Sequence, residues 1–163
     1  MQKKKTTWIL ACDAGRAQLF EELEPGRAYS PVAAFLHPEG RAHVVDLVSD
    51  TNGRKPVGVS RGVGVVRGWQ GGVQGRPGAA PDTDPKEVEA EKFARDLAAV
   101  LQKGLDDHRY QALVLVAPPH FLGLLRETVG DQVTKHLEWT LDKDLSLLSM
   151  AEIEKRVRGE RAA

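Results

Sequence analysis

Three aspartates follow segments that the sequence predicts to be strands. Asp13 ends the first such segment, and Asp142 and Asp144 come after the last. Carboxylates that converge can hold the metal ions of a metal-dependent nuclease, which makes Asp13 a weak catalytic candidate. Aspartate is also common in turns, and the later pair flanks Lys143 as in an ordinary loop. We favour the turn interpretation and expect no metal site, because the histidines and Cys12 show no ligand spacing.

A second set of candidates lies in the segment 51–81, called here the Gly-rich basic segment. Nine of the 16 glycines fall between positions 53 and 78, and the segment has no acidic residue. Arginines on a flexible backbone can follow a phosphate chain, and an aromatic ring can stack on a base. A solvated insertion is the alternative, because long surface loops cost little. We expect a mobile loop that binds RNA through Arg54, Lys55, Arg61, Arg67, Trp69 and Arg76.

The composition is that of one folded domain, residues 1–163. Hydrophobic residues make up 41% of the chain, and 23 basic side chains balance 23 acidic ones. With zero net charge, attraction to RNA must come from local clustering. Cys12 is the single cysteine, expected to be buried and unable to form an internal disulfide. No apolar run approaches a membrane span or a signal peptide, so we expect a cytoplasmic protein without a membrane partner.

The first half of the chain predicts an antiparallel hairpin and a third strand. Residues 7–12 are apolar and β-prone, and residues 17–21 alternate like a returning strand after a turn. Residues 32–36 are a plausible third strand, and 41–48 fits either a strand or a helix. After the Gly-rich basic segment, Asp84 to Glu87 has the capping signals of a helix start. Its apolar stripe leads to Gly104, which we expect to end the helix.

The second half predicts alternating strands and helices. Residues 112–117 are continuously apolar, as in a buried central strand, and a helix should run from Pro119 to near Gly130. Residues 133–141 alternate like a strand, with Leu137, Trp139 and Leu141 on one face. A capping box at 149–152 predicts a terminal helix.

The resulting order, βββ-α-β-α-β-α, is that of ribonuclease H-like folds: a mixed sheet with helices packed on it and a long Gly-rich loop inserted. Asp13 would end the first strand, where ribonuclease H enzymes place a metal-binding carboxylate. We expect the centre of the core at Phe93, Leu97, Leu113 and Leu115.

Several segments resemble the bacterial host attachment family, described as proteins required for attachment to host cells. The similarity covers nearly the whole chain. It is carried by residues 8–17 with 19–20, 47–50, 84–85 with 91–94, 113–123 and 141–145. The family name records an attachment phenotype and implies no mechanism.

The family is also distantly similar to the middle domain of archaeal and eukaryotic peptide-chain release factors and of Pelota. That domain has a ribonuclease H-like topology and carries a Gly-Gly-Gln tip before a long helix. Here Gly71, Gly72, Val73 and Gln74 occupy the corresponding place, with Val73 separating the glutamine from the glycines. The resemblance adds Gly71, Gly72 and Gln74 to the expected RNA-binding residues and makes Gln74 a weak catalytic candidate.

Three functions follow from these observations. The first is a release-factor-like module that binds RNA, the ribosome or tRNA without chemistry or a cofactor. The second is a hydrolase, either of peptidyl-tRNA through Gln74 or of nucleic acid through Asp13. The third is an intracellular factor that affects surface attachment indirectly. We favour the binding module, and the sequence leaves the oligomeric state open.

Overall fold

The computed structural model describes residues 4–37, 43–45 and 85–163, the middle range by its backbone alone. The Gly-rich basic segment, with Gly71, Gly72 and Gln74, and the predicted helix cap at Asp84 lie outside the described residues.

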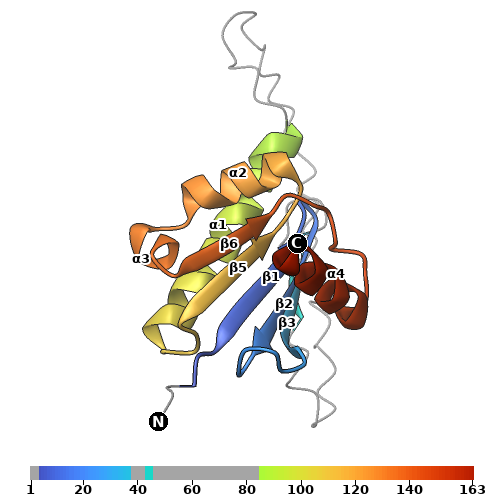
Figure 1. Cartoon of the computed structure of the whole chain (residues 1–163). Helices are drawn as coiled ribbons and strands as arrows, with labels where there is room; N and C mark the ends of the chain where they lie inside the picture. Colours follow the sequence, from blue (N-terminus) through green and yellow to red (C-terminus); the bar gives the residue numbers. More distant parts are fainter. Residues whose placement is uncertain (1–3, 38–42, 46–84) are drawn as a thin grey trace, which may run out of the picture.

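A six-stranded mixed sheet forms the centre of the molecule, in the order β4-β3-β2-β1-β5-β6 (Figure 1). The first four strands are consecutive and antiparallel: β1 (Thr7–Cys12), β2 (Arg16–Glu22), β3 (Ser30–Leu36) and β4 (His43–Val45). Strands β5 (Ala112–Val116) and β6 (Leu137–Leu141) continue the sheet parallel to β1. The predicted hairpin, third strand and central apolar strand are therefore confirmed, and the ambiguous segment 41–48 contains a strand.

Helices cover both faces of this sheet (Figure 1). On one face lie α1 (Pro85–Asp106), α2 (Pro119–Thr128) and the short α3 (Asp131–Thr134), and on the other lies α4 (Met150–Ala162). The expected capping box starts α4: the Ser149 side chain accepts from the Glu152 backbone, and the Glu152 carboxylate accepts from Ser149. The mixed α/β class is thus confirmed.

The sheet divides the core into two clusters because side chains alternate between its faces. The first cluster lies under α1 and α2 and contains Phe93, Leu97, Leu113 and Leu115, each at most 1% exposed. These are the residues expected at its centre. The second cluster lies under α4 and is smaller; its buried members are Ile9, Ala11, Phe20, Tyr29, Val114, Val116, Leu141, Leu145, Ile153 and Val157.

The expected helix end at Gly104 is wrong. Helix α1 continues to Asp106, and the chain turns at His108, whose φ of 56° is in the left-handed region. The backbone N–H of Arg109 then donates a hydrogen bond to the Gly104 carbonyl at 2.8 Å. Gly104 is required for packing instead, because a Cβ there would lie 2.3 Å from the Trp8 ring.

The expected face of the last strand is also partly wrong. Val133 belongs to α3, and β6 begins only at Leu137. The register with β5 shifts between Leu137 and Trp139, so Glu138 is an extra residue of a β-bulge. A bulge reverses the alternation of side chains. Leu137 therefore packs against the first cluster and Trp139 against the second.

Leu115→Ala should cost on the order of 2–5 kcal/mol of unfolding free energy, because it leaves a cavity under α1. Leu147→Ala is the matched control: Leu147 is 71% exposed, and its truncation should change stability by less than about 0.5 kcal/mol. Urea denaturation measures both. Equal stabilities for the two variants would show that β5 is not at the centre of the core.

Candidate functional site

Strands β1, β5 and β6 are parallel, so their carboxyl ends meet at one edge of the sheet (Figure 1). Ligands of open α/β sheets bind at this edge. Asp13 follows β1, Pro118 follows β5, and Asp142 follows β6. We call this the carboxyl edge. His37, after β3, and the first turns of α1 border the same region.

Asp13 holds the turn between β1 and β2. Its Oδ1 accepts from the backbone N–H groups of Gly15 at 2.7 Å and Arg16 at 2.8 Å. Its own N–H donates to the Arg16 carbonyl at 2.9 Å. These are the contacts of an aspartate-stabilised turn. The second oxygen, Oδ2, accepts from the Ser146 hydroxyl at 2.8 Å, so both carboxylate oxygens have a protein partner.

Ser146 stands between Asp13 and Asp144. Its Oγ lies 2.7 Å from Asp144 Oδ1, which also accepts the Ser146 backbone N–H at 3.1 Å. Ser146 is 1% exposed. The Ser146 hydroxyl thus lies within hydrogen-bond distance of both carboxylates. Within residues 4–37 and 85–163, no group of three or more His, Cys, Asp and Glu could hold a metal ion. This arrangement favours the turn interpretation of Asp13.

The segment that carries Ser146 is itself tied to the sheet. The Gln18 amide donates to the carbonyls of Ser146 at 2.8 Å and Leu148 at 3.1 Å. These long-range contacts fix the connection between β6 and α4 over the end of β1. No local pattern predicted them, because Gln18 lies well over a hundred residues earlier in the chain.

Cys12 is the last residue of β1 and is completely buried. Burial raises the pKa of its thiol far above the ordinary value, and the nearby carboxylates of Asp13 and Asp144 raise it further. A thiol in this state is not a nucleophile at neutral pH. The expectation that Cys12 is a small buried residue is confirmed.

A His37–Glu89 pair, which sequence reasoning missed, lies beside the Asp13 turn. His37 Nε2 is 3.0 Å from Glu89 Oε2, and the imidazole stacks on Phe93 with ring centroids 5.2 Å apart. Hydrogen bonds from Lys92 and then from His37 lower the pKa of the Glu89 carboxyl. The pair borders an apolar cavity of about 410 Å³ that Ala14, Gly15, Pro85, Lys86 and Ala90 also line.

The start of α2 offers little for binding a phosphate. Pro118 caps the helix without a side-chain hydrogen bond, and both Pro118 and Pro119 lack a backbone N–H. His120 is 75% exposed in its side chain and lies 3.8 Å from Glu87. It is a surface residue.

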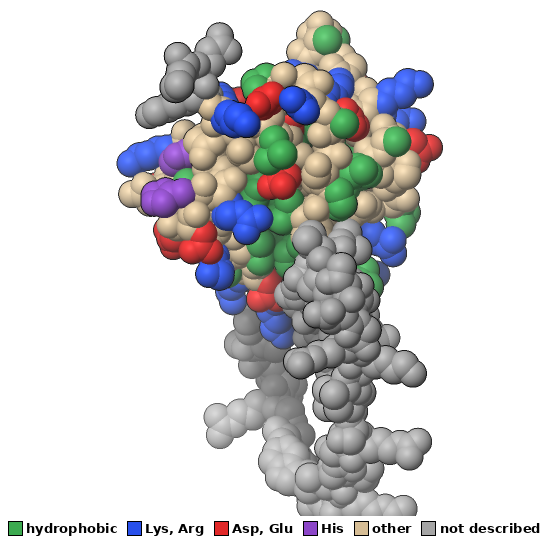
Figure 2. All heavy atoms as spheres, turned by 90° about the horizontal axis from the view of Figure 1, so that it is seen from below, with side chains coloured by type: hydrophobic (Ala, Val, Ile, Leu, Met, Phe, Trp, Pro, Cys, Tyr) green, Lys and Arg blue, Asp and Glu red, His purple; other side chains and the backbone are tan. Residues whose placement is uncertain are grey.

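The predicted RNA-binding residues and Gln74 lie outside the residues that the structure describes. Figure 2 shows one face of the described residues. Lys and Arg side chains are interspersed there with Asp and Glu, without a patch of one sign. Among the described helices, none is long and apolar enough to cross a membrane.

Asp13→Ala should cost about 1–2 kcal/mol of unfolding free energy, because the backbone N–H groups of Gly15 and Arg16 lose their side-chain acceptor and Ser146 keeps only Asp144 as a carboxylate partner. Asp13→Asn should stay within about 0.5 kcal/mol of wild type, since the amide can accept in the turn and donate to Ser146. Thermal melts with and without Mg²⁺ or Mn²⁺ test both. A metal site would contradict this account by raising the wild-type Tm with added ion, an increase that both variants would lose.

The chain matches one family model, whose description is "Protein required for attachment to host cells", over residues 8–157. No curated protein matches the chain. The match includes the Asp13 turn, the Gly-rich basic segment, α1 and the Ser146 connection. The matched model describes this family and not release factors, so the similarity to release factors stays a prediction. Because the model covers most of the sequence, the chain belongs to the family of proteins required for attachment to host cells.

Proposed function

We propose that the chain is a release-factor-like module that binds structured RNA, on the ribosome or in tRNA, through its Gly-rich basic segment. One observation carries the proposal. Residues 51–81 hold five basic side chains and no acidic one, a local charge of +5 in a chain whose total is zero. Clustered cations gain affinity for phosphates by releasing counterions.

The sheet topology supports this proposal. Strands β3, β2 and β1 are consecutive and antiparallel, and β5 and β6 extend the sheet parallel to β1. We assign this order to the ribonuclease H-like class, to which the middle domain of release factors is expected to belong. In the release-factor middle domain the Gly-Gly-Gln tip is expected to precede a long helix. Here the Gly-rich basic segment precedes α1, whose first turn borders the carboxyl edge.

The contacts at the carboxyl edge favour binding over hydrolysis. The nuclease alternative needs Asp13 to hold a metal, but both of its oxygens are engaged by Gly15, Arg16 and Ser146. The peptidyl-tRNA hydrolase alternative needs Gln74, which Val73 displaces from the glycine pair. A binding module requires neither group. An effect on translation would make the attachment role of the family an indirect one.

Replacing Arg61, Arg67 and Arg76 with Ala should weaken RNA and ribosome binding and flatten its salt dependence. Three lost phosphate contacts should reduce the slope of log K against log salt by about 2–3. The matched control replaces Arg95, Lys103 and Arg156, which removes the same charge from exposed positions on α1 and α4. Filter binding and ribosome co-sedimentation over a salt series measure both. Equal affinities of the two triple variants at low salt would refute the proposal.

Gln74→Ala separates the binding module from the hydrolase. If the segment only binds, this substitution leaves both ribosome binding and peptidyl-tRNA stability unchanged, which is the expected result. The measurement is release of labelled peptide from peptidyl-tRNA on ribosomes. A wild-type release activity that Gln74→Ala lowers by orders of magnitude, with binding intact, would establish the hydrolase instead.

A further inference from the structure

The helix α4 covers the second cluster with little apolar surface of its own. Its buried residues are Ile153 and Val157, one turn apart on a helix otherwise rich in charge. Beneath them lie Ile9, Phe20 and Val114 of the central strands, all nearly inaccessible to solvent. Removing α4 would therefore expose the middle of the sheet on this face while leaving the first cluster covered.

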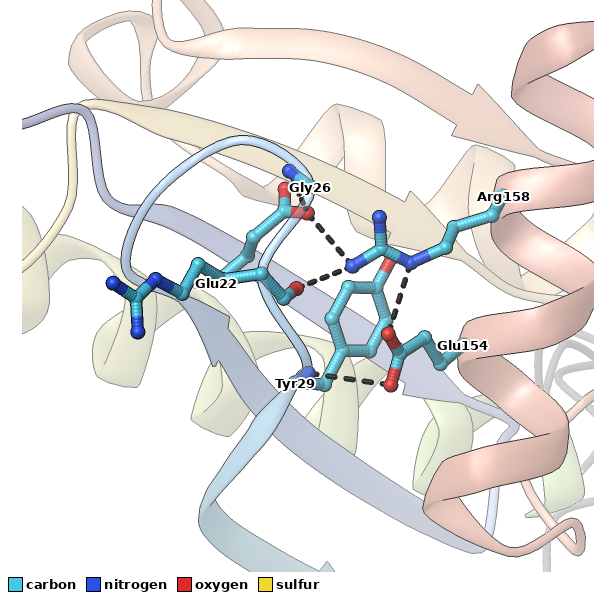
Figure 3. Close-up of polar contacts among 6 residues, drawn as sticks. Glu22, Gly26, Tyr29, Glu154 and Arg158 are labelled. Atoms are coloured by element: carbon cyan, nitrogen blue, oxygen red, sulfur yellow. Dashed lines mark hydrogen bonds and ion pairs between the residues drawn. The ribbon is translucent and has the colours of Figure 1, made fainter.

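A set of polar contacts centred on Arg158 joins α4 to the β2–β3 turn (Figure 3). Its Nη2 donates to Glu22 Oε1 at 3.0 Å, and its Nε donates to Glu154 Oε1 at 2.9 Å. Nη2 also donates to the carbonyl of Arg27. The guanidinium lies over the Tyr29 ring, 5.3 Å from its centroid. We call Glu22, Tyr29, Glu154 and Arg158 the polar clamp.

The clamp joins groups that come from the turn and from the helix. Glu22 also accepts from the Gly26 backbone at 3.0 Å, and Glu154 accepts from the Tyr29 backbone at 3.2 Å. The Glu22 side chain is only 7% exposed, whereas that of Arg158 is 35% exposed. Glu22 thus depends on Arg158 for its charge partner, and the guanidinium is within reach of solvent ions.

Two further ion pairs join α4 to β6 and to the segment that follows it, and their side chains are 31–49% exposed. Arg161 lies 3.3 Å from Glu138 of β6, and Lys143 pairs with Glu160. Such pairs contribute little and are screened by salt. Between the β2–β3 turn and the end of α4 lies a cavity of about 360 Å³, lined in part by Pro25, Tyr29 and Arg161. Packing is therefore incomplete at the clamp.

Hydrogen bonds to the β1–β2 hairpin, which do not involve α4, hold the segment before the helix. Gln18 binds the carbonyls of Ser146 and Leu148, and Asp13 binds the Ser146 hydroxyl. Helix α4 then begins at the capping box of Ser149. The contacts of the clamp with the β2–β3 turn share no residue with the hydrogen bonds of Ser146 and Leu148, so we take the junction at Ser149 as the hinge.

From this arrangement we propose that α4 is a lid over the second cluster. The polar clamp holds it closed, and screening or loss of the clamp releases α4 about Ser149 while the sheet and the first cluster stay folded. The lid controls access to the apolar face formed by Ile9, Phe20 and Val114. Release should depend on ionic strength. The helix contributes only two buried apolar side chains to its contact with the sheet, and several charged side chains make polar contacts with the rest of the fold.

Hydrogen exchange measured by mass spectrometry on the full chain tests the lid. In wild type, peptides from α4 should exchange faster as NaCl is raised, relative to peptides from α1. Arg158→Gln should speed α4 exchange by at least about tenfold at low salt, because a charge-assisted contact to buried Glu22 is lost. Arg156→Gln is the matched control: it removes the same charge from an exposed position of the same helix and should exchange as wild type.

The wild-type salt series needs no substitution, so it decides the matter even if Arg158→Gln fails to fold. Amides of α4 whose exchange rate relative to α1 does not rise with NaCl would overturn the proposal. So would an Arg158→Gln variant that folds and exchanges like the Arg156→Gln control. Faster α4 exchange with unchanged α1 and β5 exchange supports it.

Discussion

The pairing of β1 with strands on both sides is the constraint on which the other features depend. All six of its residues are buried, and it pairs antiparallel with β2 and parallel with β5. Trp8 and Leu10 face the first cluster, and Ile9 and Ala11 face the second. One strand therefore joins the hairpin half to the crossover half and divides the core in two. A shift of its register by a single residue would exchange the two faces.

The same strand explains why the polar groups at the carboxyl edge serve structure. Where β1 ends, the chain must reverse into β2, and Asp13 satisfies the donors of that turn. Ser146 and Gln18 then bring the connection to α4 over the strand end. Because Asp13, Ser146 and Gln18 are hydrogen-bonded to other parts of the protein, we regard the described residues as the scaffold that carries the Gly-rich basic segment. The proposed activity accordingly rests on the Gly-rich basic segment, whose charge the rest of the chain balances.

Elements with strong local signals could be predicted from the sequence. The apolar run of β5, the stripe of α1 and the capping box of Ser149 each need only neighbouring residues. Features that depend on distant partners could not be predicted. Gly104 has the local signal of a helix end, but its actual role depends on the distant Trp8 ring that packs against it. The bulge at Glu138 is visible only in the register of β6 with β5. The contacts of His37 with Glu89 and of Glu22 with Arg158 likewise join residues far apart in sequence.

We propose, in short, that a folded scaffold presents one basic segment to RNA. The most direct test replaces residues 51–81 with a short Gly-Ser linker and compares the variant with wild type in ribosome co-sedimentation at low salt. Circular dichroism and thermal melting serve as the control for folding. If the segment binds RNA, the variant should melt cooperatively and no longer co-sediment with ribosomes. A folded variant that binds ribosomes as wild type does would contradict it.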